Sequence, residues 1–108
     1  MVYTLEEIRN IVAPVAQKYH LPAVYLFGSY ARGTANEGSD LDLLVDTTGT
    51  DLKGLFALGA LYNDLEDALA KPIDLITLSS IQQKAQMPSD ISFRKEVMKE
   101  RIELYAVA

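Results

Sequence analysis

Three aspartates are the side chains of this sequence best suited to carry chemistry. Asp40 and Asp42 stand two positions apart at the start of an apolar run, and Asp74 stands alone within another. Residues i and i+2 of a strand point to one face about 7 Å apart, so two carboxylates can bridge a pair of cations ~3.5–4 Å apart. Three converging carboxylates raise one another's pKa unless something positive lies among them. Magnesium is the natural occupant, because it prefers carboxylate, water and phosphate oxygens.

Gly28 and Ser29 directly follow an apolar run and predict the start of a helix that faces a phosphate. Glycine lets the backbone approach an anion closely, and the first helical N–H groups would point at it together with the hydroxyl of Ser29. A tight turn with Ser29 as its N-cap has the same sequence and needs no ligand. Arg32 could contact phosphate or pair with Glu37 or solvent, whereas Gly33 is expected to serve the turn.

The spacing of apolar residues predicts the helices that must support these groups. Thr4 and Glu7 form a capping-box start for a helix over residues 5–19, and Pro14 should kink or split that helix. A long helix over residues 51–70 has apolar side chains spread more widely than one core contact requires. Toward the end of the chain we expect a short helix capped by Ser79 or Ser80, a linker at residues 87–90 and a helix over residues 91–105 with its charged side chains in solvent.

Alternating apolar residues predict the strands, which are expected at residues 23–27, 40–46 and 73–78. In the second strand, Leu41, Leu43 and Val45 share a face that helices must cover, because exposing three large aliphatic side chains is costly. The opposite face carries Asp40, Asp42, Leu44 and Asp46. In the third strand one face carries Asp74, Ile76 and Leu78. Each aspartate taken singly fits a cap, turn or solvent-facing position, and Asp46 is interpreted as a strand-end residue, but together the other three predict an acidic site.

The composition fits one small domain spanning residues 1–108. With 49% apolar and 23% charged residues, the chain can bury a core, and disorder describes it poorly. The lack of cysteine excludes disulfides, thiolate metal sites and cysteine nucleophiles, and it suits the cytoplasm. The net charge of −5 opposes direct nucleic-acid binding, and no apolar segment is long enough to predict a membrane span. The expected fold class is α/β (α+β), a small mixed sheet of about three or more strands backed by helices.

Gly28-Ser29, ten further residues and Asp40-Leu41-Asp42 together resemble the signature of the polymerase-beta-like nucleotidyltransferase superfamily. The run Gly-Ser-Tyr-Ala-Arg-Gly that begins at Gly28 is similar to the minimal nucleotidyltransferase (MNT) branch, and the resemblance extends to Leu104-Tyr105 near the end of the chain. The resemblance implies a nucleotidyltransferase core and the transfer of a nucleoside monophosphate from a triphosphate to an acceptor hydroxyl, with pyrophosphate leaving.

The same resemblance assigns roles to individual residues. Gly28 and Ser29 would hold the β and γ phosphates of ATP, with Arg32 as a further nucleotide-binding residue. Asp40 and Asp42 would ligate two Mg²⁺ ions. Asp74 would hold the catalytic metal near the attacking hydroxyl and help to deprotonate it. In-line attack at phosphorus needs positioning and charge neutralisation, which paired cations on carboxylates provide.

The partner is also implied by the resemblance. Larger relatives carry a second domain that binds the acceptor, and none is expected after the helix that ends near residue 105. A second copy of the chain or a separate protein would then supply the acceptor, as a homo-oligomer or hetero-oligomer. The MNT branch pairs with a helical HEPN ribonuclease toxin and adenylylates one of its tyrosines. We therefore expect a protein adenylyltransferase antitoxin, with the apolar helix over residues 51–70 as a candidate docking surface.

Two other interpretations stay open at this point. A non-catalytic antitoxin could neutralise its partner by binding alone, although the intact aspartates argue against an idle site. A nucleotidyltransferase could instead modify a small molecule such as an aminoglycoside, although the expected lack of an acceptor domain argues against that substrate.

Overall fold

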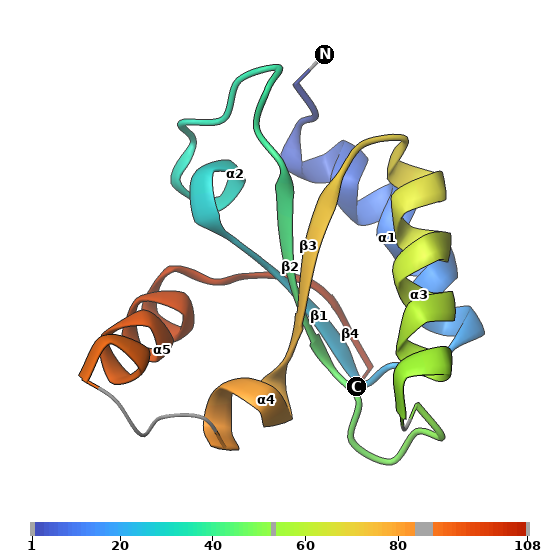
Figure 1. Ribbon diagram of the computed structural model, residues 1–108. Helices are drawn as coiled ribbons and strands as arrows, with labels where there is room; N and C mark the ends of the chain where they lie inside the picture. Colours follow the sequence, from blue (N-terminus) through green and yellow to red (C-terminus); the bar gives the residue numbers. More distant parts are fainter. Residues whose placement is uncertain (1, 53, 84–87, 108) are drawn as a thin grey trace.

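The computed structural model of this 108-residue protein describes residues 2–52, 54–83 and 88–107. Helices and strands alternate along much of the chain (Figure 1). In chain order they are α1 (Leu5–Lys18), β1 (Ala23–Phe27), α2 (Gly28–Arg32), β2 (Leu41–Asp46), α3 (Gly54–Leu69), β3 (Ile73–Thr77), α4 (Leu78–Gln83), α5 (Pro88–Glu100) and β4 (Ile102–Ala106).

The strands form a mixed sheet in the order β3-β2-β1-β4. β1 runs antiparallel to both β2 and β4, whereas β2 and β3 are parallel. A parallel pair needs a long crossover connection, and α3 supplies it between β2 and β3. The predicted fold class, a small mixed sheet backed by helices, is confirmed.

Helices cover both faces of this sheet (Figure 1). α1 and α3 pack on one face, where they bury Leu41, Leu43 and Val45 of β2 in the main core. The predicted buried face of the second strand is therefore confirmed. α4 and α5 lie over the opposite face, where a smaller apolar cluster joins Leu44 of β2 to Ile81 and Val97. Asp42 belongs to the same face as Leu44, so the second helical layer borders the candidate site.

α1 is one continuous helix, so the expected split near Pro14 is wrong, whereas the alternative, a kink, stays a prediction. Its capping box is present, with Thr4 and Glu7 bonded reciprocally through side chain and backbone. Proline removes the backbone donor that would reach Asn10, but Pro14 and Asn10 are both exposed. Water can satisfy the free carbonyl on that side, so the buried side of the helix, with Ile8 and Val12, packs without interruption.

The end of the chain differs from the sequence prediction. α5 ends at Glu100, and residues expected to continue the helix to 105 form β4 instead. β4 pairs with β1 along its length, with a register shift between Val24 and Tyr25. Pairing with β4 gives hydrogen-bond partners to the backbone groups at the edge of β1. This long-range pairing outweighs the helical spacing of Ile102 and Tyr105 from which the sequence prediction was made.

Smaller boundary differences concern the other helices. α3 begins at Gly54 rather than near residue 51, and β3 ends at Thr77 rather than Leu78. The cap of α4 is Thr77, whose hydroxyl accepts a hydrogen bond from the Ser80 N–H at 3.1 Å, rather than either predicted serine. Of the predicted linker at residues 87–90, Met87 lies outside the described residues and Pro88 already begins α5. In the described part of the chain, no helix has both the length and the apolar character needed to cross a bilayer.

Candidate active site

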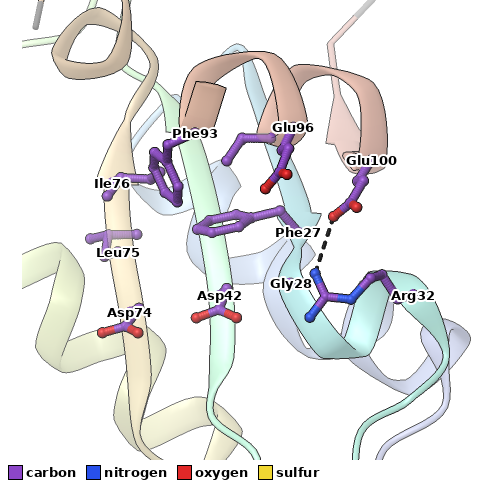
Figure 2. Close-up of a pocket in the computed structure, with 11 residues that line it drawn as sticks. Phe27, Gly28, Arg32, Asp42, Asp74, Leu75, Ile76, Phe93, Glu96 and Glu100 are labelled. Carbon is purple, nitrogen blue, oxygen red and sulfur yellow. Dashed lines mark hydrogen bonds and ion pairs between the residues drawn. The ribbon is translucent and has the colours of Figure 1, made fainter. Parts of the chain in front are cut away.

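Asp42 and Asp74 come together because β2 and β3 are parallel neighbours. The register pairs Asp42 directly with Asp74, and strand alternation turns both side chains to the face covered by α4 and α5. Figure 2 shows the two carboxylates side by side at one level of the sheet. Asp40 precedes β2, which begins at Leu41, and is exposed. The structure therefore brings together two of the three predicted aspartates.

The surroundings of Asp42 favour its protonated form. Burial raises the pKa of the Asp42 carboxyl to about 6 from 3.8, and contact with the Asp74 carboxyl and the charges of Asp74 and Asp40 add to the rise. The Arg32 guanidinium acts in the opposite direction. The protein alone favours the neutral Asp42 carboxyl over its ionised form, and a bound cation would favour the ionised form instead.

The donor set fits magnesium, although the predicted cage of three carboxylates is not formed. Among the described residues, no group of three acidic, histidine or cysteine side chains lies close enough to hold a metal together. Asp40 lies before β2, so the alternation of side chains along the strand does not place its carboxylate on the same face as that of Asp42. Asp42 and Asp74 still present paired oxygens of the kind that Mg²⁺ binds alongside water and phosphate. The metal-binding role of Asp40 stays a prediction.

Gly28 is required by the approach of α2 to β2. Its φ of +73° is strained for other residues, and a Cβ built on it would overlap the Asp42 carboxylate. The backbone of Gly28 thus lies directly against the acidic pair. The N-cap of α2 is Phe27, which makes no side-chain capping hydrogen bond, so Ser29 is not the N-cap. Gly33 closes the helix in the left-handed conformation, which confirms its expected role in the turn.

Arg32 pairs with α5 rather than with Glu37. Its guanidinium donates to the Glu100 carboxylate at 3.1 Å, and both side chains remain partly exposed. The ion pair ties α2 to α5 across the site (Figure 2). Arg32 also lines the cavity that contains Asp42.

A cavity of about 350 Å³ contains the acidic pair. Its charged end includes Gly28, Arg32, Asp42 and Asp74. Glu96 and Glu100 of α5 also line the cavity, and Figure 2 shows Glu96 beyond the Phe27 ring from the two aspartates. Its apolar end is formed by the side chains of Phe27, Ile76, Phe93 and Val97. Figure 2 shows the Phe27 and Phe93 rings on the α5 side of the two aspartates. The volume suits a small organic ligand with both charged and apolar parts.

Sequence reasoning missed the contribution of α5 to this cavity. Glu96 and Glu100 belong to the charged side chains of the last helix, which were expected in solvent. The missed signal is their helical spacing, because positions i, i+3 and i+7 lie along one side of a helix. That spacing aligns Phe93, Glu96 and Glu100 toward one place.

A mixed sheet that holds paired carboxylates against a glycine-led helix defines a class of enzyme that acts on phosphorylated nucleotides. The profile of the family described as the nucleotidyltransferase domain matches residues 7–104. Because this match covers most of the chain, the protein belongs to the nucleotidyltransferase domain family. The predicted membership of the nucleotidyltransferase superfamily is confirmed.

Two relatives and two solved structures extend this comparison. The chain is 36% identical over 77 residues to a Methanocaldococcus jannaschii protein provisionally named a protein adenylyltransferase, covering 71% of this chain and 81% of that one. It is 35% identical over 83 residues to the protein adenylyltransferase MntA of Thermococcus cleftensis, covering 73% and 82%.

Among solved structures, one provisionally described as a minimal nucleotidyltransferase is 31% identical, has a TM-score of 0.66 and aligns over 93% of this chain and 95% of its own. A chain from the complex of a tri-AMPylated Shewanella oneidensis HEPN toxin with its MNT antitoxin has a TM-score of 0.64 over 96% of this chain and 74% of its own. At 21% identity, that likeness shows a shared fold.

Proposed function

We propose that this protein transfers AMP from ATP to a hydroxyl on a protein partner, a tyrosine of a HEPN-type ribonuclease toxin, and so acts as its antitoxin. The observation that carries the proposal is the Asp42–Asp74 pair, held against Gly28 in a ligand-sized cavity. Its substrate class is supported by relatives at 35–36% identity that are named protein adenylyltransferases. The partner class is supported by the related fold of an MNT antitoxin bound to an AMPylated HEPN toxin.

In the proposed reaction the acceptor oxygen forms a bond to the α-phosphorus of ATP. The bond from that phosphorus to the bridging oxygen of the β-phosphate breaks, and pyrophosphate leaves. The hydroxyl proton passes to a carboxylate oxygen of Asp74, whose strand position faces the cavity. Gly28 admits the triphosphate close to the backbone, and the hydroxyl of Ser29 and the guanidinium of Arg32 bind its β and γ oxygens.

Magnesium dependence is part of the proposal. Asp42 and Asp74 would hold Mg²⁺, with Asp40, directly before β2, as a further ligand. When bound, the ions neutralise charge on the triphosphate and polarise the phosphorus that is attacked. The raised pKa of Asp42 supports this assignment, because a cation would favour the ionised pair that the protein alone disfavours. We assign the reaction to the cytoplasm, and we expect no direct contact with nucleic acid given the net charge of −5.

The test is incubation with α-labelled ATP, Mg²⁺ and a co-expressed HEPN-type partner, followed by mass analysis of both chains. Label and the mass of AMP should appear on a partner tyrosine, and EDTA should prevent it. Asp42→Asn and Asp74→Asn should each remove the labelling. Asp46→Asn is the matched control. Asp46 lies on the same strand face, but its carboxylate accepts hydrogen bonds from the backbone N–H and hydroxyl of Thr48 and does not line the cavity.

Silencing of the partner separates modification from occlusion. If Asp42→Asn still silences the ribonuclease while labelling is lost, the protein transfers AMP but neutralises its partner by binding, and the proposal that modification silences the toxin is wrong. If label appears on a small molecule such as an aminoglycoside and never on protein, the acceptor assignment is wrong and the transfer chemistry stands.

A further inference from the structure

The apolar end of the cavity has no role in the acidic chemistry. Phe27, Ile76, Phe93 and Val97 line it with carbon atoms, and they lie next to the charged end in the same cavity. Phe27 and Val97 are almost fully buried, at 8% and 3% exposure, whereas 49% of Phe93 is exposed. Phe93 is therefore the apolar side chain of this end with the most surface left uncovered.

The two aromatic rings at this end are packed edge to face. The Phe27 and Phe93 ring centroids lie 6.4 Å apart with an interplanar angle of 83°. In this arrangement the edge of one ring meets the face of the other, and about half of the Phe93 side chain remains exposed for contact with a flat partner. Phe93 comes from α5 and Phe27 from β1, so the aromatic corner is built by two elements that also frame the carboxylates (Figure 2).

We propose that this aromatic corner is the subsite for the base of the donor nucleotide, with Phe93 as the residue on which the base stacks. The inference rests on the proposed function, because that function places the triphosphate at the charged end. A nucleoside triphosphate carries its anionic and flat aromatic parts at opposite ends, and the cavity offers matching ends within about 350 Å³. A ligand with phosphates alone would leave the half-exposed Phe93 ring uncovered.

The chemistry of the corner also predicts how the base is chosen. Phe27, Ile76, Phe93 and Val97 have no side-chain hydrogen-bonding groups, so their contact with the base depends on ring area rather than on its edge. Stacking on aromatic side chains tolerates any base, because every base has a π-face. We therefore expect purine triphosphates to bind more tightly than pyrimidine triphosphates.

Direct binding of ATP and of inorganic triphosphate, each with Mg²⁺, tests the subsite without any transfer reaction. Phe93→Ala should weaken ATP binding by about 10- to 100-fold, the range of base-stacking losses, and leave inorganic triphosphate binding unchanged. Phe93→Tyr should retain ATP affinity, whereas Phe93→Leu, which keeps bulk without a flat ring, should not. Ile91→Ala is the matched control, since Ile91 is an apolar residue of α5 with 40% exposure that does not line the cavity.

The outcomes separate this inference from the proposed function. Unchanged ATP binding by Phe93→Ala, with a raised KM for the protein partner, would overturn the inference and assign the corner to the acceptor. Equal loss for ATP and triphosphate, or a matching loss in Ile91→Ala, would show that α5 supports the site only through its packing. Triphosphate binding without any gain for ATP refutes the base subsite and leaves the transferase intact. Failure of the wild type to bind either ligand refutes both proposals.

Discussion

Asp42 carries a carboxyl group whose ionised form the fold disfavours. Its pKa of about 6 in the folded protein exceeds the ordinary value of 3.8, so the folded state binds the proton more tightly than the unfolded state. The stability gained from protonated Asp42 is fully present below pH 3.8 and is lost as the pH rises through 6. Near neutral pH the protein carries a carboxylate that its own packing disfavours.

Replacing Asp42 by asparagine should therefore stabilise the metal-free protein near neutral pH. We expect its free energy of unfolding to rise by about 1 kcal/mol, a value reduced for solvent screening because Asp42 is only half-buried. The gain should disappear near pH 4, where wild-type Asp42 is protonated. Chemical denaturation in EDTA at the two pH values measures both effects. A variant that is less stable at both would show that burial is not the dominant influence on Asp42.

Magnesium should reverse this order of stability. A ligand that binds only the folded state raises its stability with concentration, so Mg²⁺ should raise the melting temperature of the wild type. Asp42→Asn and Asp74→Asn should show little or no such shift, whereas Asp46→Asn should respond as the wild type does. An equal shift in all four proteins would assign magnesium to another place on the surface.

Gly28 and Gly33 are required for different reasons: both have a positive φ, but only Gly28 also lies against another side chain. Both have positive φ, of 73° and 77°, but only a Cβ at Gly28 would meet the Asp42 carboxylate. Gly33→Ala should cost about 1 kcal/mol of stability from backbone strain and leave nucleotide binding intact. Gly28→Ala should cost more and abolish ATP binding, because either the Asp42 carboxylate or α2 must move to make room for the added methyl group. Denaturation and direct ATP binding distinguish the two, and equal effects would mean that strain alone matters.

Among the elements, α2 and α5 are joined across the site by the Arg32–Glu100 ion pair. In the proposed reaction Glu100 would compete with phosphate oxygens for the Arg32 guanidinium, and it lines the cavity with a further carboxyl group. Glu100→Gln should therefore tighten ATP binding by about two- to fivefold, the effect of a surface ion pair, and more at low than at high salt. Glu103→Gln removes the same charge from an exposed residue of β4 that does not line the cavity, so it should leave the ATP Kd unchanged. Weaker binding by Glu100→Gln would mean that Glu100 instead holds Arg32 in its working position.

The sequence predicts an element well where its structure depends on residues close in sequence, and poorly where it depends on contacts with distant parts of the chain. Strand alternation is local, so it placed Asp42 and Leu44 on one face and Leu43 on the other. The strand patterns predicted that the aspartates come together, but the contact of Asp42 with Asp74 depends on a parallel register between strands joined by α3, which the sequence did not predict. β4 was missed because its pairing with β1 is a contact between distant parts of the chain. The roles of Glu96 and Glu100 were missed for the same reason, since they depend on where α5 lies.

At the scale of the whole molecule, α3 carries both core and surface side chains. Leu61, Leu65 and Leu69 are fully buried, whereas Leu55 and Phe56 are 88% and 98% exposed at its first turn. The broad spread of apolar residues seen in the sequence therefore reflects a buried face and an exposed end. A domain of this size has only about 5–15 kcal/mol of stability, so truncating a buried leucine of α3 should remove a large part of it. Truncating an exposed apolar residue at the first turn should not.

Leu65→Ala should lower the free energy of unfolding by about 2–5 kcal/mol, because it leaves a cavity in the main core between α3 and the sheet. Phe56→Ala, on the same helix, should change it by less than about 0.5 kcal/mol, because the ring makes little contact with the fold. Chemical denaturation of both variants measures the difference, and comparable losses would mean that the first turn of α3 is packed in solution. Since Phe56→Ala should leave the fold intact, any weakening of partner binding that it causes would report direct contact at the candidate docking surface.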